Sequence, residues 1–199
     1  MSLGLLLILA ALGLAGYNLW SEKKAGEHAE NVVTQMEASE ESQDDKDGQL
    51  GDKDAKDAEP EFKIYPDIPM PTVLIDGHYY IGTLEIPAYG LKLPVMEEWS
   101  YPKLRVAPCR YVGSVYRDDM IIAAHNYSRH FGQIGNLIVG DEVIFTDVDK
   151  NRFVYQVIGT EILEKMDGEK MESGEWDLTL FTCTYGGRTR VTVRCKRMI

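Results

Sequence analysis

The residues of this chain best suited to covalent chemistry are Cys183, His125 and one of two arginines, Arg188 or Arg190. A cysteine attacks as its thiolate, and a free thiol at neutral pH supplies little of that form, so a nucleophilic cysteine needs a basic or cationic neighbour. His125 could exchange the proton, although it lies 58 residues before Cys183 and can meet it only through the fold. An arginine could offer charged, forked donors to a carbonyl oxygen under attack. Together these side chains would support cysteine-based acyl transfer.

The stretch Asp177–Arg197 predicts two strands joined by a tight turn. Leu178–Cys183 alternates and is rich in Thr and Phe, which suits a pleated, half-buried strand. Gly186-Gly187 is a two-residue turn signal, because both glycines can adopt positive φ without steric cost. The second run, Arg188–Lys196, is expected to alternate between two faces. One face carries Val191, Val193 and Cys195, and the other carries Arg188, Arg190, Thr192 and Arg194, of which Arg194 is expected to be a solvated charge on an edge strand. The thiol that ends the first strand therefore faces a row of arginines across the hairpin.

His125 lies where a buried strand meets a loop. The apolar run Met120–Ala124 leads directly into it. His130, five residues later, is the rival candidate, whereas His28 and His78 lie in polar segments and are expected to be solvated. A metal site at these histidines would need three or four ligands at suitable spacing, which the sequence does not show.

From Tyr79 onward the chain reads as short strands separated by turn signals, and helical periodicity is scarce. A sheet without helices to cover its faces is most economically closed on itself, so an all-β, antiparallel-rich barrel is predicted. The expected elements are strands at Gly82–Ile86, Leu91–Val95, Met120–Ala124, Glu142–Val148 and Arg152–Leu163, with a short turn within Phe131–Ile138.

The N-terminus predicts a membrane anchor. Leu3–Trp20 is apolar on every face apart from Asn18, and residues 1–21 are assigned to an uncleaved signal-anchor helix. Tyr17 and Trp20 would lie at the membrane interface. Lys23 and Lys24 follow the span, which taken alone would place the C-terminus in the cytoplasm.

Residues 22–61 predict an acidic, disordered linker. They hold fourteen acids and five lysines, a net charge of −9 within the chain total of −11, which leaves −2 for the remainder. Part of Ala25–Ala38 is expected to be helical, and Asp44–Glu59 to be an extended spacer that holds the domain off the membrane. Residues 62–199 form the predicted catalytic domain. Without a basic stripe, nucleic acid is not an expected partner.

Three motifs of this chain resemble those of the sortases, the cysteine transpeptidases of Gram-positive bacterial surfaces. TLFTC at Thr179–Cys183, followed by a short loop and RVTVR, is similar to the family's TLxTC…R signature. GTLEIPAYGLKLPV at Gly82–Val95 and IIAAHNY at Ile121–Tyr127 extend the resemblance upstream, in the order histidine, cysteine, arginine. The match covers the chain from about Tyr80 to the C-terminus.

The resemblance implies an eight-stranded sortase-like β-barrel with one or two short helices, on the extracellular side of the membrane. It implies that Cys183 attacks an LPxTG-like sorting signal of a secreted protein and forms a thioacyl-enzyme. His125 would be the acid–base group, and Arg190, which opens the apolar run, would steady the tetrahedral intermediate. The acceptor would be an amine on a cell-wall precursor or a pilin lysine. Cys109 and Cys195 are expected to be structural, and a bond between them is possible.

No cofactor or metal is expected. Some sortases bind calcium, and the chain has an acidic loop near Asp167, but a solvated acidic loop is the commoner case. Two alternatives remain at this stage. One is another cysteine acyl-transfer hydrolase, and the other is a non-enzymatic, membrane-tethered β-barrel binding module in which Cys183 belongs to the core.

Overall fold

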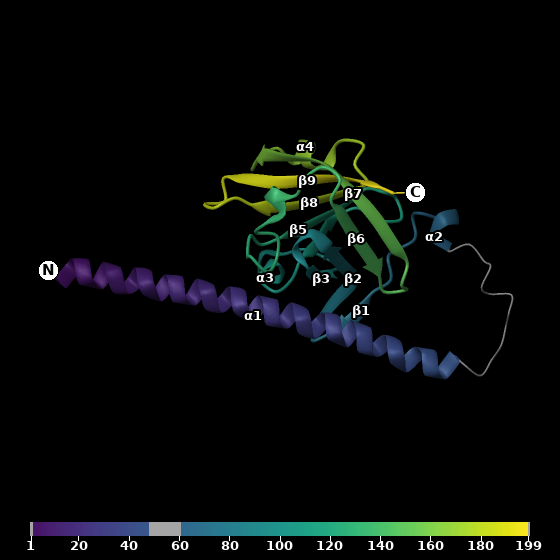
Figure 1. Ribbon diagram of the computed structural model, residues 1–199, viewed down its shortest axis with the longest axis horizontal. Coiled ribbons are helices and arrows are strands. Elements are labelled where there is room, and N and C mark those ends of the chain that lie inside the picture. Colours follow the sequence, from purple (N-terminus) through teal and green to yellow (C-terminus); the bar gives the residue numbers. More distant parts are fainter. Residues whose placement is uncertain (1, 48–60, 199) are drawn as a thin grey trace.

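The computed structural model of the chain describes residues 2–47 and 61–198. In these residues nine strands form one sheet in the order β1-β2-β3-β4-β5-β8-β9-β7-β6, and β6 also pairs with β2 (Figure 1). That last pairing closes β2 to β9 into an eight-stranded barrel, which confirms the predicted fold, and β1 is added at the start of β2. The strands are β1 (Val73–Ile75), β2 (His78–Ile86), β3 (Leu91–Met96), β4 (Cys109–Val112), β5 (Met120–Ala124), β6 (Glu142–Asp147), β7 (Arg152–Glu164), β8 (Leu178–Cys183) and β9 (Thr189–Arg197).

The helices between the strands are short. They are α2 (Glu61–Ile64), η2 (Pro87–Tyr89), α3 (Tyr101–Leu104), η3 (Ile134–Asn136) and α4 (Gly168–Glu172). Local chemistry explains one of them well. Ser100 precedes α3, and its side chain accepts a hydrogen bond from the Lys103 backbone N–H at 3.2 Å, which satisfies a donor at the helix start. More single-turn helices are present than the one or two expected, because tight loops readily close one turn.

Two of the three strands that carry the candidate site have the predicted bounds, β5 from its apolar run and β8 from its alternation. The third, β9, is shifted by one residue from the predicted Arg188–Lys196. The turn between β8 and β9 is one residue longer than the predicted bounds imply, since residues 184–188 separate the strands and Arg188 belongs to the turn. Gly186 and Gly187 have φ of +86° and +69°, values that favour glycine. Thr184 starts this longer turn, and its hydroxyl lies 2.9 Å from that of Thr189.

The barrel interior is the hydrophobic core. Alternate residues of each strand point inward, as the period of two requires, so Met120, Ile122 and Ala124 of β5 pack with Leu180 of β8 and Val193 of β9. The intervening residues of the same strands point outward. This alternation decides which side chains can reach the candidate site.

Helix α1 (Ser2–Asp47) is continuous over 46 residues, about 69 Å long at 1.5 Å per residue. Its N-terminal part projects away from the barrel (Figure 1) and exposes its leucines. An 18-residue window there has a mean hydropathy of 1.6 and is 0% buried, so by length and composition this helix could cross a membrane. The segment predicted to be an anchor is therefore helical.

The same helix continues through the first part of the acidic segment, where disorder was expected. Residues 22–47 are helical, and the helical part expected within Ala25–Ala38 is confirmed. Along one face the side chains are buried against the barrel, which gives this acidic helix an apolar stripe to dock by. The buried residues are Ala25, Ala29, Val32, Val33 and Met36. The remainder of the proposed spacer, residues 48–60, lies outside the described residues.

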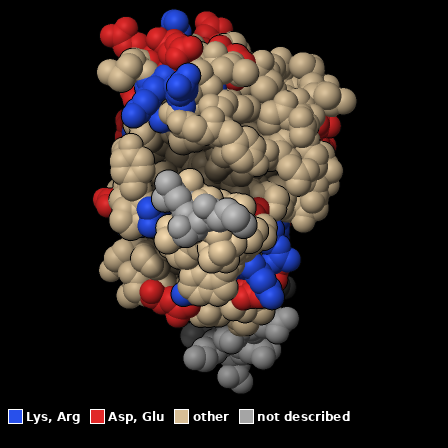
Figure 2. Space-filling model, turned by 90° about the vertical axis from the view of Figure 1, so that its left-hand side faces the viewer, with Lys and Arg blue, Asp and Glu red and all other residues tan. Residues whose placement is uncertain are grey.

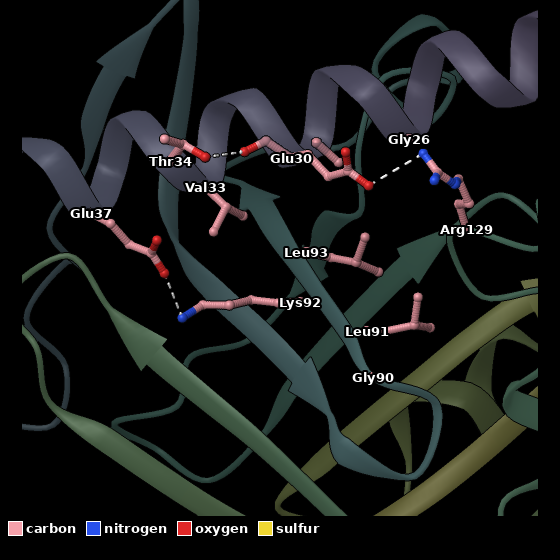
Figure 3. Close-up of a pocket in the computed structure, with 11 residues that line it drawn as sticks. Gly26, Glu30, Val33, Thr34, Glu37, Gly90, Leu91, Lys92, Leu93 and Arg129 are labelled. Carbon is pink, nitrogen blue, oxygen red and sulfur yellow. Dashed lines mark hydrogen bonds and ion pairs between the residues drawn. The ribbon is translucent and has the colours of Figure 1, made fainter.

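Where α1 crosses β3, ion pairs border the apolar contact. Lys92 of β3 pairs with Glu37 of α1 at 2.9 Å and with Glu85 of β2 at 3.2 Å. Val33 of the helix lies above Leu93 of the strand (Figure 3). The acidic half of α1 is thus a packed layer on the outside of the barrel.

Candidate active site

Three neighbouring strands bring the candidate residues together. In the antiparallel β8–β9 ladder Cys183 is directly opposite Arg190, and directly opposite residues project from the same face of a sheet. In the parallel β5–β8 ladder Ala124 pairs with Thr182. His125 follows Ala124 as Cys183 follows Thr182, so the register places the histidine beside the thiol. The three predicted residues therefore form one row across β5, β8 and β9.

This row lies on the outer face of the barrel. Thr182 and Leu180 point inward, so Cys183 and Phe181 point outward by alternation. The Thr182 hydroxyl donates a 2.8 Å hydrogen bond to the carbonyl oxygen of Ala124, and both groups are buried. This bond ties the end of β8 to the end of β5 one residue before the thiol and the imidazole. Thr182 thus has a structural role at the ends of the two strands.

His125 is half-buried and stacks on Tyr127, with ring centroids 4.9 Å apart and planes inclined by 25°. Burial lowers its pKa below the ordinary value of 6.5, and the positive charge of Arg105 lowers it further. Near neutral pH the imidazole is therefore neutral, the form that can accept a proton from a thiol. Arg105 follows α3 in the chain, and sequence reasoning did not single it out.

His130, the rival histidine, lies in the interior with 0% of its surface exposed. Its pKa is lowered to about 4, mainly by burial; the charge of His125 contributes to this lowering, and Glu22 opposes it. Within the part of the chain that the structure describes, neither of its ring nitrogens has a hydrogen-bond partner. A histidine in this position is inaccessible to a peptide on the outer face.

Arg190 is partly buried and is the second residue of β9, where it pairs with Cys183 of β8. Its Nη1 donates to the carbonyl oxygens of Gly187 and Thr189, both at 3.1 Å. Among the described residues these are its side-chain hydrogen bonds, so Nε and Nη2 remain for a substrate oxygen. Arg188 lies in the exposed turn outside the ladder. The ladder therefore fixes Arg190 opposite the thiol and leaves Arg188 outside it.

The other two cysteines are buried and unpaired. Cys109 belongs to a cluster around Tyr80 and Met96, whereas Cys195 belongs to the main core, and all three cysteines of the chain are free thiols. Burial raises the pKa of both buried thiols to about 12. Of the three, Cys183 alone is partly exposed. The open possibility of a Cys109–Cys195 disulfide is thereby answered.

An apolar wall borders the row on the outer face. Phe181 packs edge-on against Tyr111, with ring centroids 5.4 Å apart, and Tyr111 in turn contacts Trp99 at 5.4 Å. Ile121, Leu163 and Met171 form the buried part of this outer cluster. Phe181 was visible in TLFTC, but Tyr111 and Trp99 come from β4 and the loop before α3, and only the tertiary fold brings them here.

Arg194 holds helix α4 in place over this outer cluster. Sequence reasoning treated it as a solvated charge of an edge strand, but β9 lies between β8 and β7, and Arg194 is 3% exposed. Its guanidinium pairs with Glu161 at 2.8 Å and donates to the α4 carbonyl oxygens of Lys170 and Met171 at 2.6 and 2.9 Å. A buried guanidinium needs such partners, and these pin α4 against the barrel.

The site opens at the end of the barrel that faces the projecting part of α1. The β8–β9 turn points to the side on which the N-terminus lies (Figure 1). Seen from that side, the molecule is hollowed near its centre, and residues without formal charge surround most of the hollow (Figure 2). In the described residues no group of three or more His, Cys, Asp or Glu side chains could hold a metal ion.

Comparisons with known proteins agree with this geometry. Residues 84–198 match the family model of the sortase domain. Sortase C of Streptococcus pneumoniae is 27% identical, with a TM-score of 0.53 over 60% of this chain and 67% of that chain. Sortase C of Clostridium perfringens SM101 is 25% identical, with a TM-score of 0.51 over 60% and 70%. A Clostridium perfringens sortase D5 transpeptidase shares the fold at 20% identity and a TM-score of 0.55, over 74% and 93%.

No curated protein sequence matches the chain significantly. The family model nevertheless spans more than half of the chain and includes β5, β8 and β9. The chain therefore belongs to the sortase family of cysteine transpeptidases.

Proposed function

We propose that Cys183, His125 and Arg190 are the catalytic residues of a sortase that cleaves an LPxTG-like sorting signal and joins the released acyl group to an amine. The observation that carries this proposal is the row across β5, β8 and β9, in which Cys183 is opposite Arg190 and one register step from His125. The β8–β9 ladder fixes Cys183 and Arg190, whereas His125 is half-buried one residue beyond the end of β5.

In the first half-reaction the Cys183 thiol gives its proton to neutral His125, and its sulfur attacks the carbonyl carbon of the signal's threonine. Arg190 donates hydrogen bonds to the oxyanion of the tetrahedral intermediate. The C–N bond then breaks, and the imidazolium of His125 protonates the leaving amine. In the second half-reaction the acceptor amine attacks the thioester and gives its proton to His125. The C–S bond breaks, and the thiolate takes that proton back.

The apolar wall supports an extended, partly apolar peptide as the substrate. Phe181 lies two residues before Cys183 on the same outward face, and Tyr111 continues the apolar surface across the barrel. A peptide laid along this face would place apolar side chains on the wall and its scissile carbonyl over the thiol. Burial of one such side chain contributes about 1.5–3 kcal/mol, enough to favour a signal with a leading apolar residue.

For the acceptor, an amine on a cell-wall precursor and a pilin lysine both fit the chemistry. The structure of the Streptococcus pneumoniae sortase C is described in terms of pilin substrate specificity, and it is 27% identical to this chain. The catalytic domain, assigned to residues 62–199, works outside the cell in this proposal, with the apolar part of α1 as a single-pass anchor. Tyr17 and Trp20, whose ring centroids are 6.2 Å apart, suit the interface.

The test uses the full chain in detergent with a panel of sorting-signal peptides and amines. Cys183→Ala should abolish both peptide cleavage and amine ligation, and intact-mass spectrometry of the parent protein should trap the acyl adduct on Cys183. Cys109→Ala and Cys195→Ala are the matched controls, since both thiols are buried and should retain the chemistry at some cost in stability. Turnover by Cys183→Ala would refute covalent catalysis at this thiol. Cleavage without ligation to any amine would favour a hydrolase.

A further inference from the structure

Helix α1 touches the loop that follows His125 at successive points. The hydroxyls of Ser21 and Tyr127 lie 3.3 Å apart, and a Glu22 carboxylate oxygen accepts hydrogen bonds from both the backbone N–H and the hydroxyl of Ser128. About two turns further along, Glu30 pairs with Arg129 at 3.3 Å. The contacted residues are consecutive, and they begin two positions after His125.

Gly26 permits this close approach. A Cβ at this position would overlap the aliphatic part of the Arg129 side chain and lie 2.8 Å from its Nη1. Figure 3 shows Arg129 reaching the helix at Gly26 and pairing with Glu30. Within α1, three other glycines, at positions 4, 13 and 16, have nothing within 4 Å of such an added atom. Gly26, on the barrel side of the helix, therefore leaves the space that the Arg129 side chain occupies.

Hydrogen bonds within the loop connect the residues that touch α1 to His125. Backbone N–H groups of His130 and Gly132 both donate to the Tyr127 carbonyl oxygen at 2.9 Å, and Phe131 N–H donates to His125 O at 3.1 Å. The Tyr127 ring itself stacks on the His125 ring. On its other side the loop is anchored by Phe131, which is fully buried in the core.

We propose that the first turns of α1 after Trp20 are part of the catalytic unit, and that Ser21 and Glu22 position His125 through Tyr127 and Ser128. This inference rests on the proposed role of His125 as the acid–base group. Both are positioning residues, because they touch the loop and not the substrate. The acidic helix acts as a brace on the histidine loop, and its role differs from the spacer that its composition suggested.

The contact between α1 and the histidine loop also determines where the active site lies relative to the membrane. Trp20 ends the apolar part of the helix, and Glu22, which contacts the histidine loop, follows about 3 Å further along the helix axis. The His125 end of the barrel is therefore held at the membrane surface. An acyl acceptor or sorting signal still attached to the membrane would be presented to this end directly.

Glu22→Ala in the full chain is the decisive variant, with Glu27→Ala as its matched control. Glu27 is an exposed residue of the same helix, and its ion pair is with Lys23 at 3.7 Å and not with a residue of the histidine loop. Since misplacement of an acid–base group by about 1 Å can cost about a hundredfold, we expect Glu22→Ala to lower kcat about tenfold with KM changed less than about twofold. Glu22→Gln keeps an acceptor oxygen for Ser128 and should restore at least about half of kcat.

Amide hydrogen exchange gives a readout independent of activity. The Ser128 N–H should exchange faster in Glu22→Ala than in Glu22→Gln or Glu27→Ala, because its acceptor is gone. Equal kcat in Glu22→Ala and Glu27→Ala would overturn the inference, as would an equal loss in Glu22→Gln. If Glu22→Ala fails to fold, Tyr127→Phe takes its place, since it keeps the ring on His125 and loses the hydroxyl contact with Ser21. Failure of the proposed function is distinguished by His125→Ala, which would then remain active.

Discussion

The pH dependence of stability separates the roles of the two histidines in this loop. His130 is fully buried, and its folded-state pKa of about 4 lies below the ordinary value of 6.5 that it regains on unfolding. As the pH falls below 6.5, His130 becomes protonated in the unfolded chain but stays neutral in the folded protein until the pH approaches 4. The stability that neutral His130 contributes is therefore complete above pH 6.5 and is lost progressively as the pH falls toward 4.

The size of the effect follows from the same two values. A separation from 6.5 to about 4, at about 1.4 kcal/mol per pH unit, corresponds to about 3 kcal/mol, of which about 2 kcal/mol is lost between pH 7.5 and 5. Such a loss is a large fraction of the 5–15 kcal/mol typical of a domain. It should be readily visible in an unfolding experiment.

The assay is urea unfolding of the full chain and of His130→Met, in the same detergent, between pH 4.5 and 7.5. Methionine has a similar volume and no proton to bind, and its flexible side chain suits an irregular apolar site. Burial also lowers the pKa values of His125 and His28, but both proteins share these groups, so they cancel in the difference. The wild type should lose about 2 kcal/mol more than the variant between pH 7.5 and 5. Parallel curves for the two proteins would refute the buried, neutral state of His130.

Three further predictions concern the row itself. His125→Ala should lower kcat/KM by at least about a hundredfold. In the parent enzyme the acid limb of kcat/KM should fall below pH 6.5. Arg105→Ala should move this limb to higher pH, because it removes the cation that lowers the His125 pKa, and pH–rate profiles of both proteins measure the difference. Arg190→Lys should be nearly as damaging as Arg190→Ala, at roughly 3–4 kcal/mol mainly in kcat, while Arg188→Ala is tolerated in steady-state kinetics; the opposite ranking would mean that the loop register is misassigned. Thr182→Val should cost roughly 1–3 kcal/mol in urea unfolding, since it leaves the buried Ala124 carbonyl without its donor, and an unchanged midpoint would contradict that view.

The strands of the site could be read from the sequence because strict alternation marks them. In β9 the inward side chains Val193 and Cys195 alternate with outward polar or charged ones, and in β8 Leu180 and Thr182 alternate with Thr179, Phe181 and Cys183, so a pattern of period two leaves little freedom. The proximity of His125 to Cys183 could not be predicted from alternation alone. It depends on the parallel pairing of β5 with β8, a long-range contact that only the family resemblance could anticipate.

The docking of α1 was missed although its signal was present. Ala25, Ala29 and Val33 recur at a spacing of four, with Val32 and Met36 beside them, which is the stripe of a helix with one buried face. The high content of Glu and Lys masked this stripe because composition averages over all faces of a helix. Arg194 was misread for a related reason, since an alternating arginine looks solvated until α4 folds over it.

The three members of the row differ in how they are held, and this difference makes the membrane helix relevant to catalysis. Cys183 and Arg190 are fixed by the β8–β9 ladder, which any folded barrel contains. His125 lies one residue beyond the end of β5, so the loop after it decides where the imidazole points. That loop is bounded on one side by the core and on the other by α1. Because the proposed catalytic row is complete only when all three groups are in place, we infer that α1 also completes the site.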